Sequence, residues 1–260
     1  MIDLHCHILP GADDGAGSEE ESLAMARLAV EDGVRAIVAT PHALNGVYTN
    51  PAGKIISQVA ALREALSKSN IELELYAGAD VHLCPHILKR IQKGEACTIN
   101  NAMKYILLEL PSRTILRGVK EEVFSLKVNG ITPIITHPER NALIQQDAEA
   151  LYELVSMGAL AQVTAMSVTG GFGTFVARSA ENLLRNRLVH MIVSDAHSPD
   201  YRPPVLSRAV ERAAEILGDH EEAERMVQSV PNAILENKVP EVPEPSPGKP
   251  KKWFFARFFK

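Results

Sequence analysis

The sequence has little of what marks secreted or membrane-spanning proteins. Three of its 260 residues are cysteine, which argues against a disulfide framework and for a reducing compartment. The first residues lack the basic and apolar regions of a signal peptide, and no apolar run approaches the roughly 20 residues that span a bilayer. We therefore expect a cytoplasmic protein.

Aromatic residues are also scarce, and they are unevenly distributed. Five of them lie in the last eight positions: Trp253, Phe254, Phe255, Phe258 and Phe259. The stretch from residue 249 onward also holds five basic and no acidic residues, which leaves 22 basic and 32 acidic residues in the rest of the chain. A body this acidic is a poor electrostatic match for a phosphate backbone, so we expect no nucleic-acid partner.

Short aliphatic runs alternate with longer segments of helical period, which is the pattern of repeated βα units and a parallel sheet. The seven expected strands are residues 2–5, 35–39, 72–77, 105–109, 132–136, 159–164 and 190–194. The expected helices are residues 19–32, 52–68, 85–93, 116–129, 148–157, 172–187, 205–217, 221–228 and, after Pro231, 232–237. Seven βα units with little left over favour a single α/β domain, a distorted (β/α)7 TIM-like barrel, over an open sheet.

The composition changes at Lys238 to a proline-rich stretch. Such a sequence is stiff and extended, and we expect it to have no means of burying itself. The predicted organisation is a folded domain over residues 1–237, a linker over 238–250 and a disordered basic, aromatic tail over 251–260. Cations and aromatics together suit an anionic membrane surface, so residues 249–260 are a candidate for peripheral anchoring. Docking of the tail on a neighbouring subunit or on its own domain is the alternative.

Imidazoles and carboxylates follow the ends of almost all the expected strands, where a parallel barrel builds its site. His5 and His7 point to the same face, because side chains alternate along an extended segment. The other candidate metal ligands are Asp14, His42, Asp80, Glu109, His137, Asp195 and His197. Nitrogen and oxygen ligands of this kind suit Zn, Mn or Fe, and their number implies two or three ions.

These residues, with the phrases His137-Pro-Glu-Arg-Asn and Ser194-Asp-Ala-His, resemble the polymerase and histidinol phosphatase (PHP) superfamily. The N-terminal Met-Ile-Asp-Leu-His-Cys-His-Ile-Leu-Pro, Asp13-Asp14-Gly15, Gln162-Val-Thr-Ala and Gly171-Phe-Gly173 resemble one branch of it. That branch contains the bacterial manganese-dependent protein-tyrosine phosphatases of capsule and exopolysaccharide synthesis. The resemblance implies a PHP fold and two or three Mn²⁺ ions per subunit, with Fe, Co or Zn as alternatives. It also implies a phosphotyrosine protein as substrate, namely a membrane-associated tyrosine autokinase, which would place the protein at the inner face of the membrane. Whether the protein forms a homo-oligomer is left open by the sequence.

The resemblance also implies roles for individual residues. It places His5, His7 and Asp195 on one ion, Glu109 and His137 on a second, Asp14, His42 and His197 on a third, and Asp80 as a bridge between ions. The bridging position is commonly Glu in the family, and Asp80 is shorter. Arg140 and Arg202 correspond to phosphate contacts, and His42 or a bound water could protonate the departing phenolate.

Other enzyme classes remain as alternatives. Histidinol-phosphate phosphatases and polymerase-associated nucleases belong to the same superfamily. Binuclear amidohydrolases also carry His-x-His on the first strand, but they bridge their ions with a modified Lys on the fourth strand, where this sequence has Glu109. A catalytically silent adaptor that acts through its tail is disfavoured by the intact ligand set.

One motif suggests a different chemistry. Cys84 and Arg90 satisfy the Cys-x5-Arg pattern of cysteine-dependent tyrosine phosphatases, which need a loop whose amides surround the phosphate. Here no glycine intervenes, and Pro85 predicts an ordinary helix that begins at once. His82 and His86 flank this helix start with no carboxylate in phase, so we expect them at the surface or at the substrate rim. The segment Thr169-Gly-Gly-Phe-Gly173 could approach phosphate, but a mobile turn before the next helix is the more common meaning of such a sequence.

Overall fold

The computed structural model describes residues 1–113 and 118–247. All strand pairs in this part of the chain are parallel. The strands are β1 (Ile2–Cys6), β2 (Ala36–Ala39), β3 (His42–Ala43), β4 (Glu74–Ala77), β5 (Asp80–His82), β6 (Tyr105–Glu109), β7 (Thr132–Thr136), β8 (Leu160–Thr164) and β9 (Met191–Val193). They form two sheets, in the orders β1-β2-β4 and β3-β5-β6-β7-β8-β9.

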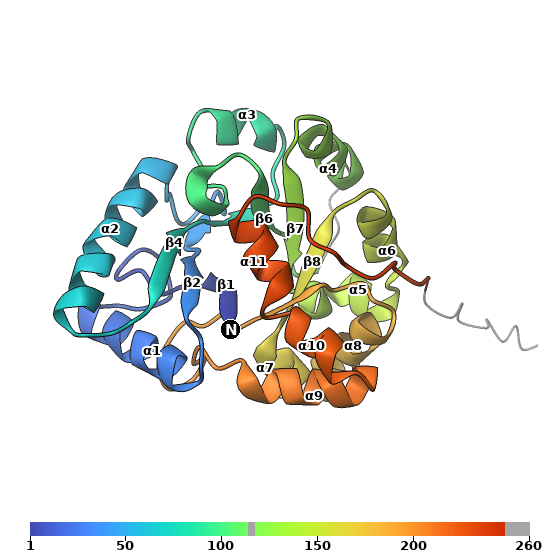
Figure 1. Ribbon diagram of the computed structural model, residues 1–260. Helices are drawn as coiled ribbons and strands as arrows, with labels where there is room; N and C mark the ends of the chain where they lie inside the picture. The colour runs from blue at the N-terminus through green and yellow to red at the C-terminus, as the bar shows by residue number, and fades with distance from the viewer. Residues whose placement is uncertain (114–117, 248–260) are drawn as a thin grey trace, which may run out of the picture.

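The two sheets follow one another around a single barrel (Figure 1). β3 continues β2 beyond Pro41, which has no N–H for a ladder, and β5 continues β4 beyond Gly78. A Cβ at Gly78 would lie 2.7 Å from a methyl carbon of Val38, so only glycine allows the strands to approach this closely. At the other seam the Asp195 N–H donates to the His5 carbonyl at 2.9 Å. The seven predicted strands and the barrel are confirmed, whereas β3 and β5, which extend two of these strands, were not predicted.

Helices surround the barrel, and most follow the predicted ranges within a few residues. They are α1 (Glu19–Glu31), α2 (Ala52–Lys68), α3 (Ile87–Gln92), α4 (Val119–Val128), α5 (Ala142–Gln146), α6 (Glu149–Ser156), α7 (Ala165–Val168), α8 (Thr174–Arg185), α9 (Ser207–Leu217), α10 (His220–Arg225) and α11 (Ser229–Leu235), with 3-10 turns at Ile99–Asn101 and Pro138–Arg140. The short α5 and α7 were not predicted, because fewer than two turns show no periodicity. The prediction that the last helix starts after Pro231 was wrong: α11 begins at Ser229, since proline fits the first helical turn.

Two layers of apolar side chains result from the alternation along the strands. One cluster fills the barrel and includes Leu4, Val38, Leu107, Ile134 and Val193. The larger cluster lies between the strands and the surrounding helices. Because the barrel interior is packed, polar chemistry is left to the ends of the strands.

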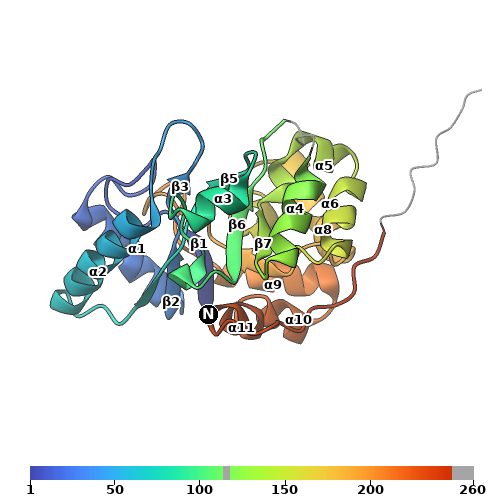
Figure 2. The ribbon, with the colours of Figure 1, turned by 90° about the horizontal axis from the view of Figure 1, so that it is seen from above.

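The C-terminal segment closes the amino-terminal end of the barrel. Ile234 of α11 belongs to the interior cluster, and Figures 1 and 2 show α11 on the same side of the barrel as the N-terminus. The chain then runs on across this end: Pro240 is buried, the Tyr105 hydroxyl donates to the Lys238 carbonyl at 2.6 Å, and the Ser246 N–H donates to a carbonyl at the end of α8 at 2.9 Å.

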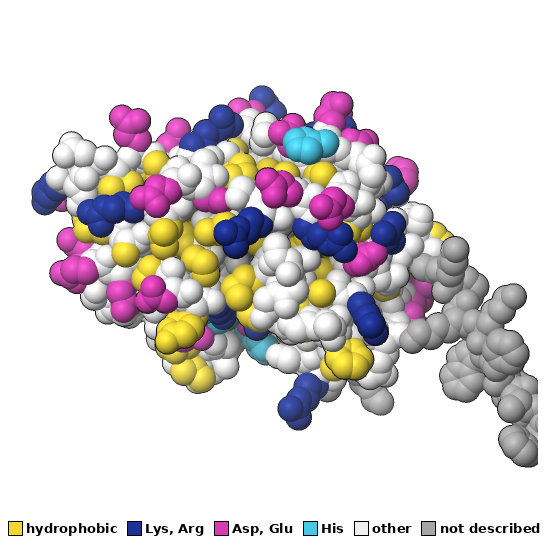
Figure 3. Space-filling view, turned by 90° about the horizontal axis from the view of Figure 1, so that it is seen from below, with side chains coloured by type: hydrophobic (Ala, Val, Ile, Leu, Met, Phe, Trp, Pro, Cys, Tyr) yellow, Lys and Arg dark blue, Asp and Glu magenta, His cyan; other side chains and the backbone are white. Residues whose placement is uncertain are grey.

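In the described residues 238–247, part of the proline-rich stretch therefore packs on the domain, although we predicted that it had no means of burying itself. Proline lacks an N–H that needs a partner, so an extended proline segment can lie on an apolar surface at little cost in unpaired groups. The basic, aromatic tail over residues 251–260 lies outside the described residues. Within residues 1–113 and 118–247, no helix combines the length and apolar character needed to cross a membrane. The face in Figure 3 carries acidic and basic side chains interspersed among apolar ones.

Candidate metal centre

A β-bulge in β1 directs the histidine pair into the mouth of the barrel. The register between β1 and β2 shifts between Asp3 and Cys6. Before the shift, Leu4 belongs to the cluster that fills the barrel, and after it Cys6 packs in the outer layer. With Cys6 pointing outward, His5 and His7 share the inner face. Their two Nε2 atoms lie 3.0 Å apart.

The structure brings the predicted ligands together at the carboxyl ends of the strands. Three groups offer ligand atoms within 4.8 Å of one another: His7, Asp14, His42 and His197; His5, His7 and Asp80; and His42, Asp80 and Glu109. The other two candidates border these groups. His137 Nε2 lies 3.7 Å from Glu109 Oε1, and Asp195 Oδ1 lies 3.5 Å from His5 Nε2. All nine predicted residues therefore surround one centre.

Strained backbone aims two of these side chains. His137 directly follows β7 with φ 33°, and Asp195 follows β9 with φ 51°. Residues other than glycine rarely adopt this left-handed conformation, which costs on the order of 1 kcal/mol each. This conformation turns the chain at the ends of β7 and β9 and directs the His137 and Asp195 side chains toward the candidate site.

Asp80 provides the test of whether the centre fits a metal. Its side chain is fully buried, and neither carboxylate oxygen has a hydrogen-bond partner in the described part of the chain. Oδ2 lies 3.3 Å from His42 Nδ1 and 3.8 Å from His5 Nε2. A buried carboxylate without partners costs several kcal/mol unless a cation balances it. The surrounding nitrogen and oxygen atoms are suitable ligands, so the residues fit divalent ions.

Further polar groups fix how the histidines point, and the sequence did not reveal them. Asp13 Oδ2 lies 2.6 Å from His7 Nδ1 and accepts the His42 N–H at 2.7 Å, so the other nitrogen of His7 turns toward the centre. Gln162, on β8, contacts His5 Nδ1 through its side-chain amide nitrogen. Such partners orient metal-binding histidines. Asp13 adjoins the predicted ligand Asp14, and spacing alone could not separate their roles.

The buried charges strongly perturb one another. Burial opposes protonation of His7, but hydrogen bonds with Asp13 and Asp195 raise its pKa to about 10. Burial, together with the positive charge on His7, lowers the pKa of His197 to about 3. Although burial acts in the opposite direction, the surrounding imidazoles and Arg202 hold the pKa of Asp195 well below its usual range. The centre therefore gathers imidazoles and carboxylates whose protonation states depend on one another, as at many functional sites.

Asp195 connects the centre to the two predicted phosphate contacts. Its Oδ1 faces His5 and His7, while its Oδ2 accepts from Arg140 Nη1 at 2.8 Å and from Arg202 Nη2 at 2.5 Å. The two guanidinium groups thus converge at the edge of the ligand cluster, and both remain partly exposed. Forked donors at this position suit the oxygens of a phosphoryl group.

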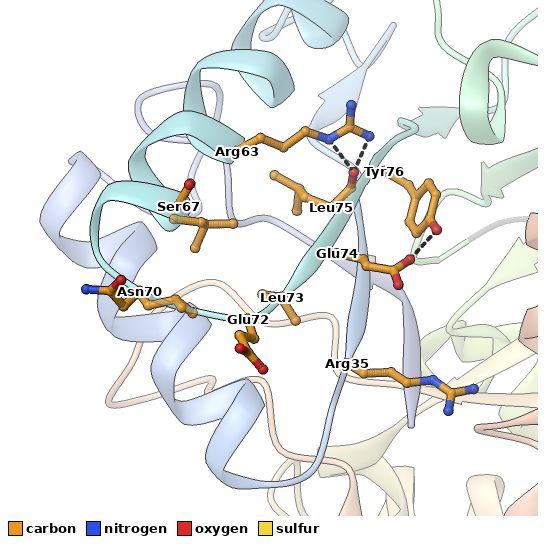
Figure 4. Close-up of a pocket in the computed structure, with 11 residues that line it drawn as sticks. Arg35, Arg63, Ser67, Asn70, Glu72, Leu73, Glu74, Leu75 and Tyr76 are labelled. Carbon is orange, nitrogen blue, oxygen red and sulfur yellow. Dashed lines mark hydrogen bonds between the residues drawn. The ribbon is translucent and has the colours of Figure 1, made fainter.

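A cavity of about 210 Å³ opens beside these groups and is lined by Glu109, Thr136, His137 and Arg140, among others. A larger hollow of about 720 Å³ lies between α2 and β4 (Figure 4). Two of its polar side chains are engaged locally: Arg63 donates to the Leu75 carbonyl at 2.8 Å, and the Tyr76 hydroxyl donates to Glu74 at 2.5 Å. The described metal-ligand groups lie elsewhere, so we assign the chemistry to the smaller cavity.

The Cys-x5-Arg segment does not form a phosphate loop. The chain turns at His86, with φ 61°, and α3 begins at Ile87, so the prediction that a helix starts at Pro85 was wrong. The position that an anion would take at this helix start is held by Glu122, whose carboxylate accepts the His86 N–H at 2.8 Å. Arg90 pairs with a glutamate five residues further on.

His82 was predicted without a carboxylate partner, and this was wrong. It lies opposite Glu109 in the β5–β6 pair, and its Nδ1 is 3.3 Å from Glu109 Oε2. Burial acts in the opposite direction, but this contact and the nearby imidazoles lower the pKa of Glu109. Strand register, which the sequence does not display, creates the contact.

Comparisons with known proteins agree with this geometry. A family model described as "Capsular polysaccharide synthesis, CpsB/CapC" matches residues 1–236. The chain is 38% identical to the tyrosine-protein phosphatase YwqE of Bacillus subtilis (strain 168), over 76% of this chain and 78% of YwqE. It is 30% identical to the tyrosine-protein phosphatase CpsB of Streptococcus pneumoniae, over 92% of this chain and 100% of CpsB. A crystal structure from work on YwqE and CpsB, called "unique metal-dependent tyrosine phosphatases", matches with a TM-score of 0.91 at 34% identity, over 96% of this chain and 100% of that one.

Proposed function

The chain belongs to the CpsB/CapC family of capsular polysaccharide synthesis, and from this membership we propose that it is a metal-dependent protein-tyrosine phosphatase. The observation that carries the proposal is the buried carboxylate of Asp80, which has no hydrogen-bond partner within the described residues and lies among convergent imidazoles. The chain also matches metal-dependent tyrosine phosphatases over nearly its whole length. The match to the family model and to these relatives confirms the family that the sequence motifs indicated.

The proposed metal centre uses all nine predicted ligands. His5, His7 and Asp195 would hold one ion, Glu109 and His137 a second, and Asp14, His42 and His197 a third, with Asp80 between ions. Three overlapping groups of ligand atoms support two or three ions. We propose Mn²⁺, although general affinity would favour zinc at equal availability, and Fe or Co could use the same donors.

Divalent ions bound here would lower the pKa of a water molecule and offset the charge of phosphoryl oxygens. The chain's own residues supply the remaining functions. Arg140 and Arg202 bind the phosphoryl group from the side of Asp195 and stabilise the charge that develops on it. Asp13 keeps His7 oriented. The proton for the leaving oxygen would come from a bound water or from His42. A phenolate has a reference pKa of about 10 and leaves with little such help.

The decisive test is substrate choice with metals varied. The purified protein, stripped of metal and reloaded separately with Mn²⁺, Fe²⁺, Co²⁺ or Zn²⁺, is assayed on a phosphotyrosine peptide, histidinol phosphate, single-stranded DNA and a dihydropyrimidine amide. We expect the phosphotyrosine peptide to be hydrolysed fastest, and fastest with Mn²⁺. Preference for any of the other three substrates would replace the proposal by a superfamily phosphatase, a nuclease or an amidohydrolase. Ion counts by mass spectrometry accompany each assay.

We also propose a physiological partner and a location. The substrate would be a membrane-associated bacterial tyrosine autokinase, met by a cytoplasmic phosphatase that binds the inner membrane surface through residues 249–260. The five cations and five aromatics near the C-terminus support this, since each basic residue near an anionic surface adds about 1 kcal/mol.

Co-sedimentation with vesicles tests the location. The full chain is compared with a truncation at residue 247, which keeps the packed proline segment. We expect the full chain to sediment with vesicles of anionic lipid and the truncated one to stay in solution. Equal sedimentation of the two would contradict anchoring and favour the tail's docking on protein instead.

A further inference from the structure

The segment between α7 and α8 is an ordered turn that presents one aromatic side chain. Gly171 N–H donates to the Met166 carbonyl at 2.7 Å, and Gly173 N–H donates to the Gly170 carbonyl at 2.9 Å. Gly170 and Gly173 have φ of 87° and 89°, which other residues rarely adopt, and a Cβ at Gly171 would lie 2.9 Å from the Met166 methyl carbon. Two backbone hydrogen bonds therefore close this turn and define where Phe172 lies.

This turn places Phe172 against both proposed phosphate contacts. The guanidinium carbon of Arg140 lies 4.9 Å from the centre of the Phe172 ring, and that of Arg202 lies 5.7 Å from it. A guanidinium within about 6 Å over an aromatic ring is attracted by the ring's negative face. The two arginines come from distant parts of the chain, the turn after β7 and the loop after β9, and Phe172 is a side chain that both approach.

Without the Phe172 ring, the two positively charged guanidinium groups at the Asp195 carboxylate would repel each other and move apart. Arg140 and Arg202 share a single oxygen of Asp195. That contact anchors one end of each fork, while the ring limits how far each guanidinium can rotate away. A donor pair held in place before the phosphate arrives loses less entropy on binding it.

We propose that Phe172 is a positioning residue that holds Arg140 and Arg202 together for the phosphoryl group. The inference rests on the proposed phosphatase function. It makes the specific claim that the ring acts through the arginines and hence on the phosphate itself. A ring that instead contacted the tyrosyl side chain of the substrate would affect only aryl phosphates.

The test compares Phe172→Leu, which keeps apolar volume but removes the ring's charge distribution, with Phe172→Tyr, which keeps the ring. The matched control is Phe175→Leu, three positions further on, where the side chain is 79% exposed. Steady-state kinetics on phosphotyrosine and phosphoserine peptides, inhibition by inorganic phosphate, and thermal unfolding are measured on metal-loaded protein.

We expect Phe172→Leu to raise both KM and the inhibition constant of inorganic phosphate about ten-fold, and to change kcat less. The increase in KM should be the same for the phosphotyrosine and the phosphoserine peptide. Phe172→Tyr should stay within about two-fold of the wild type, and Phe175→Leu should not differ from it. Unchanged phosphate inhibition in Phe172→Leu, or a loss confined to the phosphotyrosine peptide, would overturn the inference while leaving the phosphatase itself established. A wild type that hydrolyses neither peptide would instead remove the proposed function, and direct calorimetric binding of inorganic phosphate would still compare the variants.

Discussion

Asp80→Asn is expected to lower the turnover number of the phosphatase by on the order of a thousand-fold or more. The reason is that divalent ions would carry the chemistry and that this carboxylate lies between their proposed sites. Asparagine has nearly the same shape but no charge. The Asp80 carboxylate lies beside the imidazoles of His5 and His42. An amide in its place would weaken the binding of metal ions without leaving a cavity. The bound ions, counted by mass spectrometry, should fall together with turnover.

The unfolding temperature of the metal-free protein shows whether Asp80 is a metal ligand or a structural residue. The buried carboxylate of Asp80 faces imidazoles but has no hydrogen-bond partner among the described residues, so we expect it to destabilise the protein when no cation balances it. Stripped of metal, Asp80→Asn should therefore unfold at the same temperature as the wild type or at a higher one. Marked destabilisation of the metal-free variant would identify Asp80 as a structural residue. Cys84→Ser serves as the control and should keep nearly full activity; a loss of several hundred-fold there would move the chemistry to the thiol.

The second large effect is expected from the arginine pair. Arg202→Lys keeps the positive charge but loses the planar fork that contacts Asp195 and, in the proposed function, would also reach a phosphoryl oxygen. We expect kcat/KM for a phosphotyrosine peptide to fall about a hundred-fold, as removal of one donor to a developing charge usually does. Arg140→Lys should behave similarly.

Coupling between the two arginines is part of this prediction. Because both guanidinium groups hydrogen-bond the same oxygen of Asp195, the double variant should lose less than the product of the single losses. Arg63→Lys, in the hollow beside α2, is the matched control and should leave kcat/KM unchanged. Single losses below about three-fold would exclude the pair from phosphate binding.

Much of this site follows from local sequence. Strand ends could be recognised because a short aliphatic run followed by His, Asp or Glu is visible without knowing its neighbours. In a parallel barrel all such ends meet at one rim, so His5, Asp80 and Asp195 could be grouped although they are far apart in the chain. The chemistry of imidazole and carboxylate then predicts a cation.

What escaped prediction depends on partners from other elements. Asp13 and Asp14 are indistinguishable in sequence, and only the folded loop gives Asp13 to His7. His82 meets Glu109 through strand register, and Phe172 meets two arginines through a turn whose glycines close it.

The amino-acid pattern thus predicted the barrel and the proposed ligand set, because periodicity and strand-end chemistry are local properties, and its motifs indicated the family. The tertiary structure decided which carboxylate orients a histidine, where the proline segment packs and what supports the arginines. Those contacts join residues distant in sequence, and their energies depend on burial and distance, which arise only once the chain has closed on itself.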